Sequence, residues 1–505
     1  MKRGRSSTDY EPVTRSRQKQ LPVSEAAAAD WPLRVNGSTS GEPPPAETEK
    51  SQPARSASRV IEGERWSLKR GHSLSYAGLF LYTTFVYFRP YELSPSLAPL
   101  VWVTFWLAVA TLIVFIPSQL ALEGTLTARP REVNLVLLLT LTALLSIPLA
   151  IDPAVAWATF NFVFIKAVLM FIVMVNVLRT ERRLKGLILL ALAVGCMISA
   201  SAFNDYRLGN FTVEGYRVVG NIGGMFGNAN DMALHLAIMV PIAIVLFLST
   251  RNVLKKALYG ACILLMVAGT FVTYSRGAFL GLACAGVVLA YKLGRRNRLL
   301  VIGLIIFAIA VTLVLAPGDY AVRLVSIFDH SLDRTGSAQQ RQALLFRSIW
   351  IALNNPIFGV GMGNFHIVSI RGLVSHNSYT QVAAEIGFPA LIIYTLFMIA
   401  PYKRLRRIEH ETFTATRHGS RFYYLAVGLQ ASLVCYMVSS FFISVAYQWN
   451  IYYLAGYAIC LSRLHETGRA AAGSGDAVDF NGRASENETL DSLHIDKMLS
   501  VKGDD

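Results

Sequence analysis

The sequence predicts an all-α, polytopic integral membrane protein, and three observations lead to this fold class. Hydrophobic residues make up 53% of the 505 residues, charged residues only 16%, and the mean hydropathy is +0.43. A soluble domain usually carries about 25% charged residues. In addition, long apolar runs recur through the middle of the chain, and basic residues gather in alternate segments between them, as in membrane proteins with basic cytoplasmic loops.

The charge distribution divides the chain into three parts. Residues 1–70 carry a net charge of +4 and are rich in Ser, Pro, Ala, Glu and Arg, so we expect a disordered cytoplasmic tail without a signal peptide. Residues 463–505 carry −4 and predict a second disordered cytoplasmic tail. The total of +15 therefore lies within 71–462, the expected transmembrane domain. Basic residues in an apolar region argue against a nucleic-acid partner.

Twelve apolar segments are candidates for spanning helices, each of which needs about 20 mostly apolar residues. With the N-terminus placed inside, 19 of the 29 basic residues of 71–462 fall in cytoplasmic loops. An even number of spans also leaves the C-terminus inside. The candidates are 74–88, 97–117, 133–151, 160–178, 184–203, 230–249, 256–274, 277–292, 299–316, 378–400, 421–441 and 445–462.

Two segments on the outer face are long enough to do chemistry, roughly 204–229 and the long loop at about 317–377. Within the long loop, apolar residues recur at helical spacing up to Pro356, with Trp350 as an anchor. This pattern predicts a helix that either lies on the membrane surface or packs inside a small outer domain. The apolar residues of this helix are Leu345, Ile349, Trp350 and Leu353.

Two arginines on the outer face are candidates for binding an anion. Arg276, in TYSRGAF, stands at the outer end of a span, and Arg217 precedes the Gly-rich segment GNIGGMFGNAND. A guanidinium stays charged and forms paired hydrogen bonds, which suits a diphosphate, and Gly-rich backbone before a helix can offer amides to the same anion. The alternatives are an arginine that reaches the lipid head groups and a glycine-rich turn.

The stretch SHNSYTQVAAEIGFP predicts a polar site where the long loop re-enters the membrane. His376 stands at that point, and a histidine there can act as a general base. Asn377, Gln381 and Glu385 follow at i, i+4 and i+8, so they form one stripe that should face protein or a water-filled cavity. Asn377 and Glu385 are candidates for orienting the histidine or an acceptor.

Metal or cofactor chemistry is not expected. The five cysteines sit in apolar runs without CxxC spacing, and we expect them to be small packing residues. The glycines of NNPIFGVGMGNF predict a tight turn, because no strand–helix unit surrounds them to form a dinucleotide site. The cysteines are Cys196, Cys262, Cys284, Cys435 and Cys460, and the glycines are Gly359, Gly361 and Gly363.

Four stretches together resemble the O-antigen ligase and O-antigen polymerase superfamily of bacterial inner-membrane glycosyltransferases. They are YRVVGNIGGMFGNANDMAL, YSRGAFLG, RQALLFRSIWIALNNPIFGVGMGNF and HNSYTQVAAEIGFPAL. Ligases of this family show a His, then Asn, Ser or Gln, nine residues and Gly-x-x-Gly. Here His376 and Asn377 are followed by nine residues and Gly387, with Ala390 at the last position. FRPYELSPSLAPL is similar to the exosortase-associated O-glycosylation ligase branch.

The resemblance implies roles for individual residues. His376 would match the catalytic histidine of the family, and Arg217 and Arg276 would match the arginines thought to hold the lipid diphosphate. Arg341 would match a recurrent arginine ahead of the Gly-rich turn. The implied reaction transfers a glycan from undecaprenyl diphosphate to a lipid, glycan or protein acceptor hydroxyl on the periplasmic face, without ATP or another cofactor.

Several alternatives remain open at this stage. Within the same chemistry, the protein could be an O-antigen or exopolysaccharide polymerase, or a protein O-glycosylation ligase. A transporter of a lipid-linked or anionic substrate would also suit twelve spans. A membrane scaffold without activity would leave Arg276 and His376 without a role. One long outer loop and motifs gathered at the outer face favour an enzyme over a transporter.

Overall fold

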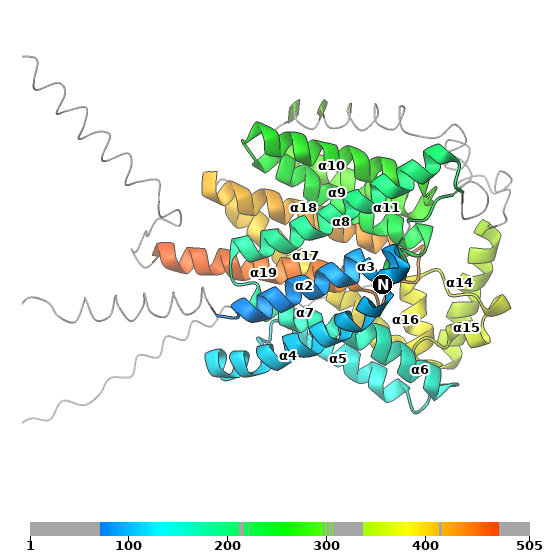
Figure 1. Cartoon of the computed structure of the whole chain (residues 1–505). Helices are drawn as coiled ribbons and strands as arrows, with labels where there is room; N and C mark the ends of the chain where they lie inside the picture. Colours follow the sequence, from blue (N-terminus) through cyan, green and yellow to red (C-terminus); the bar gives the residue numbers. More distant parts are fainter. Residues whose placement is uncertain are drawn as a thin grey trace, which may run out of the picture. The chain divides into compact units, whose positions relative to one another are not determined.

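The computed structural model describes residues 71–211, 217–220, 222–295, 298–299, 302–303, 306, 337–413 and 417–473. Every regular element of these ranges is a helix (Figure 1). The expected N-terminal tail lies outside the described residues, as do residues 474–505 of the expected C-terminal tail. The last helix continues to Gly473, past the predicted boundary at 462.

The described helices form two groups in chain order. The first group is α2 (Ser73–Phe88), α3 (Pro90–Leu93), η1 (Pro95–Leu100), α4 (Val101–Glu123), α5 (Arg131–Ser146), α6 (Pro153–Thr159), η2 (Phe160–Phe164), α7 (Ile165–Val177) and α8 (Glu181–Leu208). The second group is η3 (Gly224–Phe226), α9 (Ala229–Ser249), α10 (Val253–Val272), α11 (Arg276–Gly294), α14 (Ser337–Asn354), α15 (Phe365–Val368), η5 (Ile370–Gly372), α16 (Ser378–Ile386), α17 (Phe388–Thr412), α18 (Arg417–Ser439) and α19 (Trp449–Gly473).

Among the described residues, seven helical stretches are long and apolar enough to cross a membrane, and they coincide with seven of the twelve predicted spans. The protein is therefore polytopic and helical, as predicted. The predicted spans 74–88 and 133–151 fall on α2 and α5, which have only 16 residues each. Most of the predicted span 299–316 lies outside the described residues. The count of twelve stays a prediction.

The predicted span 378–400 is not one continuous helix in the structure. It is divided between α16 and α17, and α17 continues to Thr412. The break falls at Gly387, whose φ of 98° is open to glycine and rarely adopted by other residues. A Cβ at Gly387 would collide with the carbonyl oxygen of Ile357, so the chain passes too close here for any other residue.

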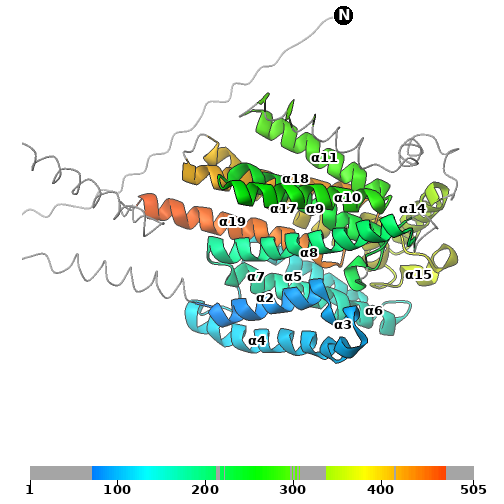
Figure 2. The ribbon, with the colours of Figure 1, turned by 45° about the horizontal axis from the view of Figure 1, so that its top comes forward.

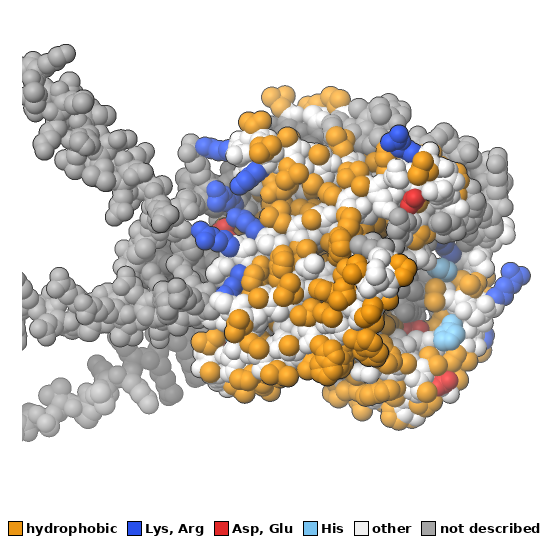
Figure 3. All heavy atoms as spheres, in the orientation of Figure 1, with side chains coloured by type: hydrophobic (Ala, Val, Ile, Leu, Met, Phe, Trp, Pro, Cys, Tyr) orange, Lys and Arg blue, Asp and Glu red, His pale blue; other side chains and the backbone are white. Residues whose placement is uncertain are grey.

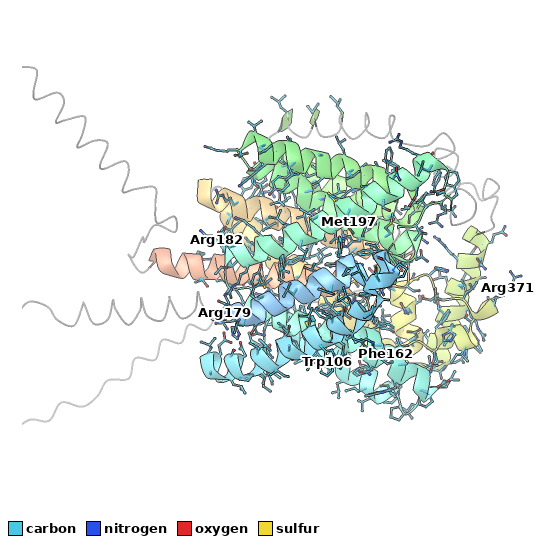
Figure 4. All side chains as sticks on the ribbon, viewed as in Figure 1. Trp106, Phe162, Arg179, Arg182, Met197 and Arg371 are labelled. Atoms are coloured by element: carbon cyan, nitrogen blue, oxygen red, sulfur yellow. The ribbon has the colours of Figure 1, made fainter. Side chains whose placement is uncertain are left out.

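Helices α9 and α18 form the centre of the bundle, and α4 lies at its margin. In both α9 and α18, 72% of the apolar window is buried, compared with 11% in the stretch formed by η1 and α4. Figures 1 and 2 show α4 beside α2 at the edge of the bundle. Hydrophobic side chains cover this lateral face in Figure 3, and Trp106 and Phe162 lie on it in Figure 4. A bilayer can cover such a face, because its hydrocarbon is as apolar as these side chains.

Basic residues gather at one end of the bundle, which we call the basic end. Lys292 pairs with Glu409 between the ends of α11 and α17, and Arg179 pairs with Glu123 between the start of α8 and the end of α4. Figure 3 shows Lys and Arg side chains at this end, where Figure 4 labels Arg179 and Arg182. Arg371 is labelled at the opposite end, near α14 and α15.

Helix α14 lies at the opposite end and runs across the bundle rather than along it (Figure 1). One of its faces packs on α16 and buries Leu344 and Ile351. Another face exposes an apolar stripe, so the predicted helix is present and combines both expected features. The exposed residues are Phe346, Ile349, Trp350 and Leu353, whereas Leu345 is partly buried.

Candidate functional site

His376 occupies a strained backbone position immediately before α16. Its φ of 51° lies in the left-handed region, which costs a non-glycine residue about 1–2 kcal/mol. The side chain of the next residue, Asn377, caps α16 by accepting hydrogen bonds from the backbone N–H groups of Tyr379 (2.9 Å) and Thr380 (3.0 Å). The cap therefore fixes the first residue of α16 and the position of His376 just before it. Strain of this kind is concentrated at functional sites.

The surroundings of His376 keep its imidazole neutral. Burial disfavours the charged ring, and the nearby positive charge of Arg341 repels it, so the pKa of His376 is lowered from 6.5 to about 4. At pH 7 the ring is therefore unprotonated and can accept a proton. Arg341 lies on α14, which packs against α16.

One segment, residues 439–445, holds the beginnings of both α16 and α11. The backbone N–H of Ser378 donates to the carbonyl oxygen of Ser440 (2.9 Å), and the Ser378 hydroxyl donates to the carbonyl oxygen of Ile443 (2.6 Å). The Ser439 hydroxyl donates to the carbonyl oxygen of Gly277 (3.1 Å). Arg276, the first residue of α11, and His376 thus stand on segments that contact the same short stretch of chain.

Arg217 joins the turn before α11 to the first turn of α9. Its Nε donates to the carbonyl oxygen of Thr273 (2.8 Å), and its Nη2 donates to Oδ1 of Asn230 (2.8 Å). The side chain is buried, with 4% exposed. Arg217 and Arg276 therefore flank one turn, whose middle residue, Tyr274, also has a positive φ of 53°.

These contacts bring the beginnings of α9, α11 and α16 to the same end of the bundle. The unpaired N–H groups of a helix N-terminus carry a partial positive charge and favour anions. The sequence-predicted cationic residues therefore lie at the same end of the bundle as the histidine. The residues brought there are Arg217, Arg276, Arg341 and His376.

Glu385 lies two turns along α16 from His376 and supports the Gly-rich turn. Its Oε1 accepts from the backbone N–H of Phe365 (3.4 Å), and its Oε2 accepts from Nε2 of Gln381 (3.5 Å). The backbone N–H of Gly361 also donates to the carbonyl oxygen of Glu385 (2.9 Å). Gly361 has a φ of 100°, where a side chain would be strained. These contacts connect Glu385 to the predicted tight turn.

Buried polar residues of α9 pair with residues at the start of α19, and the sequence analysis did not include them in the site. Asp231 accepts a long hydrogen bond from Gln448 (3.5 Å), and Nδ1 of His235 lies 3.5 Å from Oδ1 of Asn450. Polar residues four apart within a span, Asp231 and His235, were the available signal. Three buried polar atoms of these residues and of Gln381 have no hydrogen-bond partner among the described residues: Gln381 Oε1, Gln448 Oε1 and Asn450 Nδ2.

Arg89 and Glu92 were also missed as site residues, although they belong to the FRPYE stretch. They form an ion pair with an N–O distance of 2.6 Å, and Glu92 accepts a hydrogen bond from the backbone N–H of Gly223. Across the described part of the chain, no group of three His, Cys, Asp or Glu residues could hold a metal ion. All five cysteines are free.

The fold is that of a multi-pass helical membrane protein, and the predicted site residues lie toward the end opposite the basic end. Residues 261–395 match the family described as O-antigen ligase. The matched segment is about a quarter of the chain, and it confirms the predicted resemblance to the O-antigen ligase superfamily. Arg276, Arg341 and His376 fall inside the matched segment, and Arg217 precedes it. No curated protein matches the chain.

Proposed function

We propose that the protein transfers a glycan from an undecaprenyl-diphosphate carrier to an acceptor hydroxyl on the periplasmic side of the inner membrane. The observation that carries the proposal is a neutral, strained histidine beside Arg341, within the O-antigen ligase segment. A base next to cationic groups suits a reaction that removes a proton and releases an anion.

In the proposed reaction, the acceptor oxygen attacks the anomeric carbon of the donor sugar. The bond from that carbon to the diphosphate oxygen breaks, and the diphosphate leaves with the electron pair. His376 takes the proton of the acceptor hydroxyl, and Arg217 and Arg276 stabilise the charge that develops on the diphosphate. A single displacement inverts the anomeric centre. The lipid diphosphate supplies the driving force, so ATP is not needed.

Donor binding also makes His376 a stronger base. Arg341 disfavours the protonated ring in the free protein. A diphosphate bound nearby places negative charge close to the histidine, and one unit charge at about 5 Å contributes roughly 3 kcal/mol at an effective dielectric constant of about 20. The pKa of His376 therefore rises when the donor is bound, which couples proton acceptance to the presence of the substrate.

In this proposal Asn377 and Glu385 act indirectly, by capping α16 and by holding the Gly-rich turn against it.

The orientation in the membrane belongs to the same proposal. The basic end would face the cytoplasm, because Lys and Arg are enriched in cytoplasmic loops. The site end and the long loop would then face the periplasm, with twelve spans and both termini inside. Attachment of a membrane-impermeant thiol reagent to single cysteines introduced at Arg371 and Arg182 tests this orientation. Labelling of intact spheroplasts at position 182 instead of 371 would overturn it.

The reaction is tested with purified protein in nanodiscs and a radiolabelled lipid-linked glycan. Wild-type protein should release undecaprenyl diphosphate and form an elongated or ligated product, and His376→Ala should not. Retention of full transfer by His376→Ala would refute the role of the histidine as a base. A deletion strain separates the acceptors: loss of a ligase leaves unattached lipid-linked polymer, loss of a polymerase leaves single units, and loss of a protein ligase removes a glycoprotein.

A further inference from the structure

The connection between α2 and α3 contains a charged residue where glycine would be expected. Arg89 ends α2 and precedes Pro90, with φ 44° and ψ 58° in the left-handed region. A non-glycine residue in this conformation is strained, and such strain is concentrated at sites with a function. The side chain of Arg89 is about four-fifths buried, since 21% is exposed.

Arg89 and Glu92 form an ion pair that is hydrogen-bonded to the Gly-rich segment. Nη2 of Arg89 pairs with Oε1 of Glu92 (2.6 Å), and Nε of Arg89 donates to the hydroxyl of Tyr91 (2.8 Å). The other carboxylate oxygen of Glu92 accepts a hydrogen bond from the backbone N–H of Gly223 (2.6 Å). Glu92 thus joins a guanidinium on its own turn to a backbone amide from a distant part of the chain. We call this pair the clamp.

The segment bonded to the clamp has a backbone conformation that brings Gly224 close to the guanidinium of Arg89. Gly224 has a φ of 63°, and a Cβ at this position would collide with Nη1 of Arg89. Glycine is therefore favoured at 224 by its conformation, and the guanidinium of Arg89 occupies the space that a side chain there would take.

The held segment lies between two parts of the candidate diphosphate site. Arg217 precedes it, and Asn228, the cap of α9, and Asn230, the partner of Arg217, follow it. Residues 222–227 thus connect Arg217 to the start of α9 along the chain, and Arg217 also bonds to Asn230 of α9 directly. We propose that Arg89 and Glu92 are positioning residues that hold this segment for binding of the lipid diphosphate; the diphosphate part rests on the proposed function.

The chemistry of the clamp makes distinct predictions for its variants. Glu92→Gln keeps an oxygen that can accept from the N–H of Gly223, whereas Glu92→Ala removes it. The reversed pair, Arg89→Glu with Glu92→Arg, restores an ion pair but leaves Gly223 without an acceptor, because an arginine side chain only donates. A purely electrostatic role would be rescued by the reversed pair, and a positioning role would not.

The experiment uses the full chain in nanodiscs, with undecaprenyl diphosphate as the probe. Hydrogen–deuterium exchange of the 218–228 amides reports the clamp, and the Kd of the probe reports the site. Glu92→Ala should speed exchange and weaken binding about tenfold, as expected for a lost hydrogen bond to a charged group. The Kd of Glu92→Gln should stay within about threefold of the wild-type value. The reversed pair should show the faster exchange and weaker binding expected of Glu92→Ala. Glu181→Ala, which breaks an exposed pair with Lys185 at the basic end, is the control and should change neither.

Two results would overturn the proposal. The first is that the 218–228 amides of Glu92→Ala exchange at the wild-type rate. The second is that they exchange faster but the Kd of the probe is unchanged. Full rescue by the reversed pair would also contradict the role of Gly223 as the anchored group. If the wild-type protein itself does not bind the probe, the proposed function fails, and the exchange data alone decide whether the clamp holds the segment.

Discussion

Replacing Arg341 with Gln tests how the protein controls the basicity of His376. The pKa of His376 is lowered from 6.5 to about 4, which is about 2.5 pH units. Burial is the larger cause and the positive charge of Arg341 is the smaller one, so removing that charge should recover less than half of the lowering. The acid limb of kcat/KM should therefore lie near pH 4 in the wild type and move up by less than about 1.2 pH units in Arg341→Gln.

The assay is glycan transfer in nanodiscs as a function of pH, because kcat/KM reports groups of the free enzyme. Arg347→Gln is the matched control. This arginine is on the same helix, but its guanidinium lies over the ring of Trp350 and donates to the carbonyl oxygen of Val368. Arg347→Gln should leave the acid limb in place. A wild-type limb near pH 6.5, or a downward movement in Arg341→Gln, would refute the reasoning about His376.

The remaining predictions concern stability. Gly361→Ala should destabilise the protein by about 2–4 kcal/mol, because the φ of Gly361 is 100° and an added Cβ would collide with its neighbours. Gly286→Ala is the control, because this residue of α11 has open space around it, and the change should raise Tm slightly. Lys292→Met should lower the stability by about 3–5 kcal/mol, because the buried carboxylate of Glu409 loses its ion-pair partner and keeps only the hydrogen bond from Gln430. Adding Glu409→Leu should restore most of the loss in Tm. Between pH 6.5 and about 4 the unfolded His376 binds a proton that the folded one does not, so stability should fall as pH falls through this window, and less so in His376→Gln. An unchanged Tm in Gly361→Ala or Lys292→Met, or equal acid sensitivity of His376→Gln and wild type, would contradict the corresponding argument.

The helical membrane fold could be predicted because it follows from local composition. Apolar windows of about 20 residues identify spans whatever their neighbours are, and the basic loops mark one end. The break at Gly387 could not be predicted, because it depends on the approach of the chain at Ile357. The same applies to α14, whose apolar stripe was visible while its second, buried face depends on packing against α16.

In the candidate site, too, individual residues could be predicted from the sequence, but contacts between residues far apart in the chain could not. His376 and Arg276 stand out in the sequence because ionisable groups are costly near the membrane. The contacts of their neighbours Ser378 and Gly277 with residues 439–445 are a tertiary feature that sequence spacing does not reveal. Asn377 was expected to orient a histidine or acceptor, and its side chain caps α16. Glu92 could not be connected with Gly223, because 130 residues separate them along the chain.

The most direct test of the central claim is a single-turnover measurement of undecaprenyl diphosphate release from a lipid-linked glycan by His376→Ala in nanodiscs. A general base typically contributes about 10²–10⁴-fold to the rate. We predict a loss of that size with the Kd for undecaprenyl diphosphate unchanged. Release by His376→Ala at the wild-type rate would contradict the claim that this histidine takes the acceptor proton.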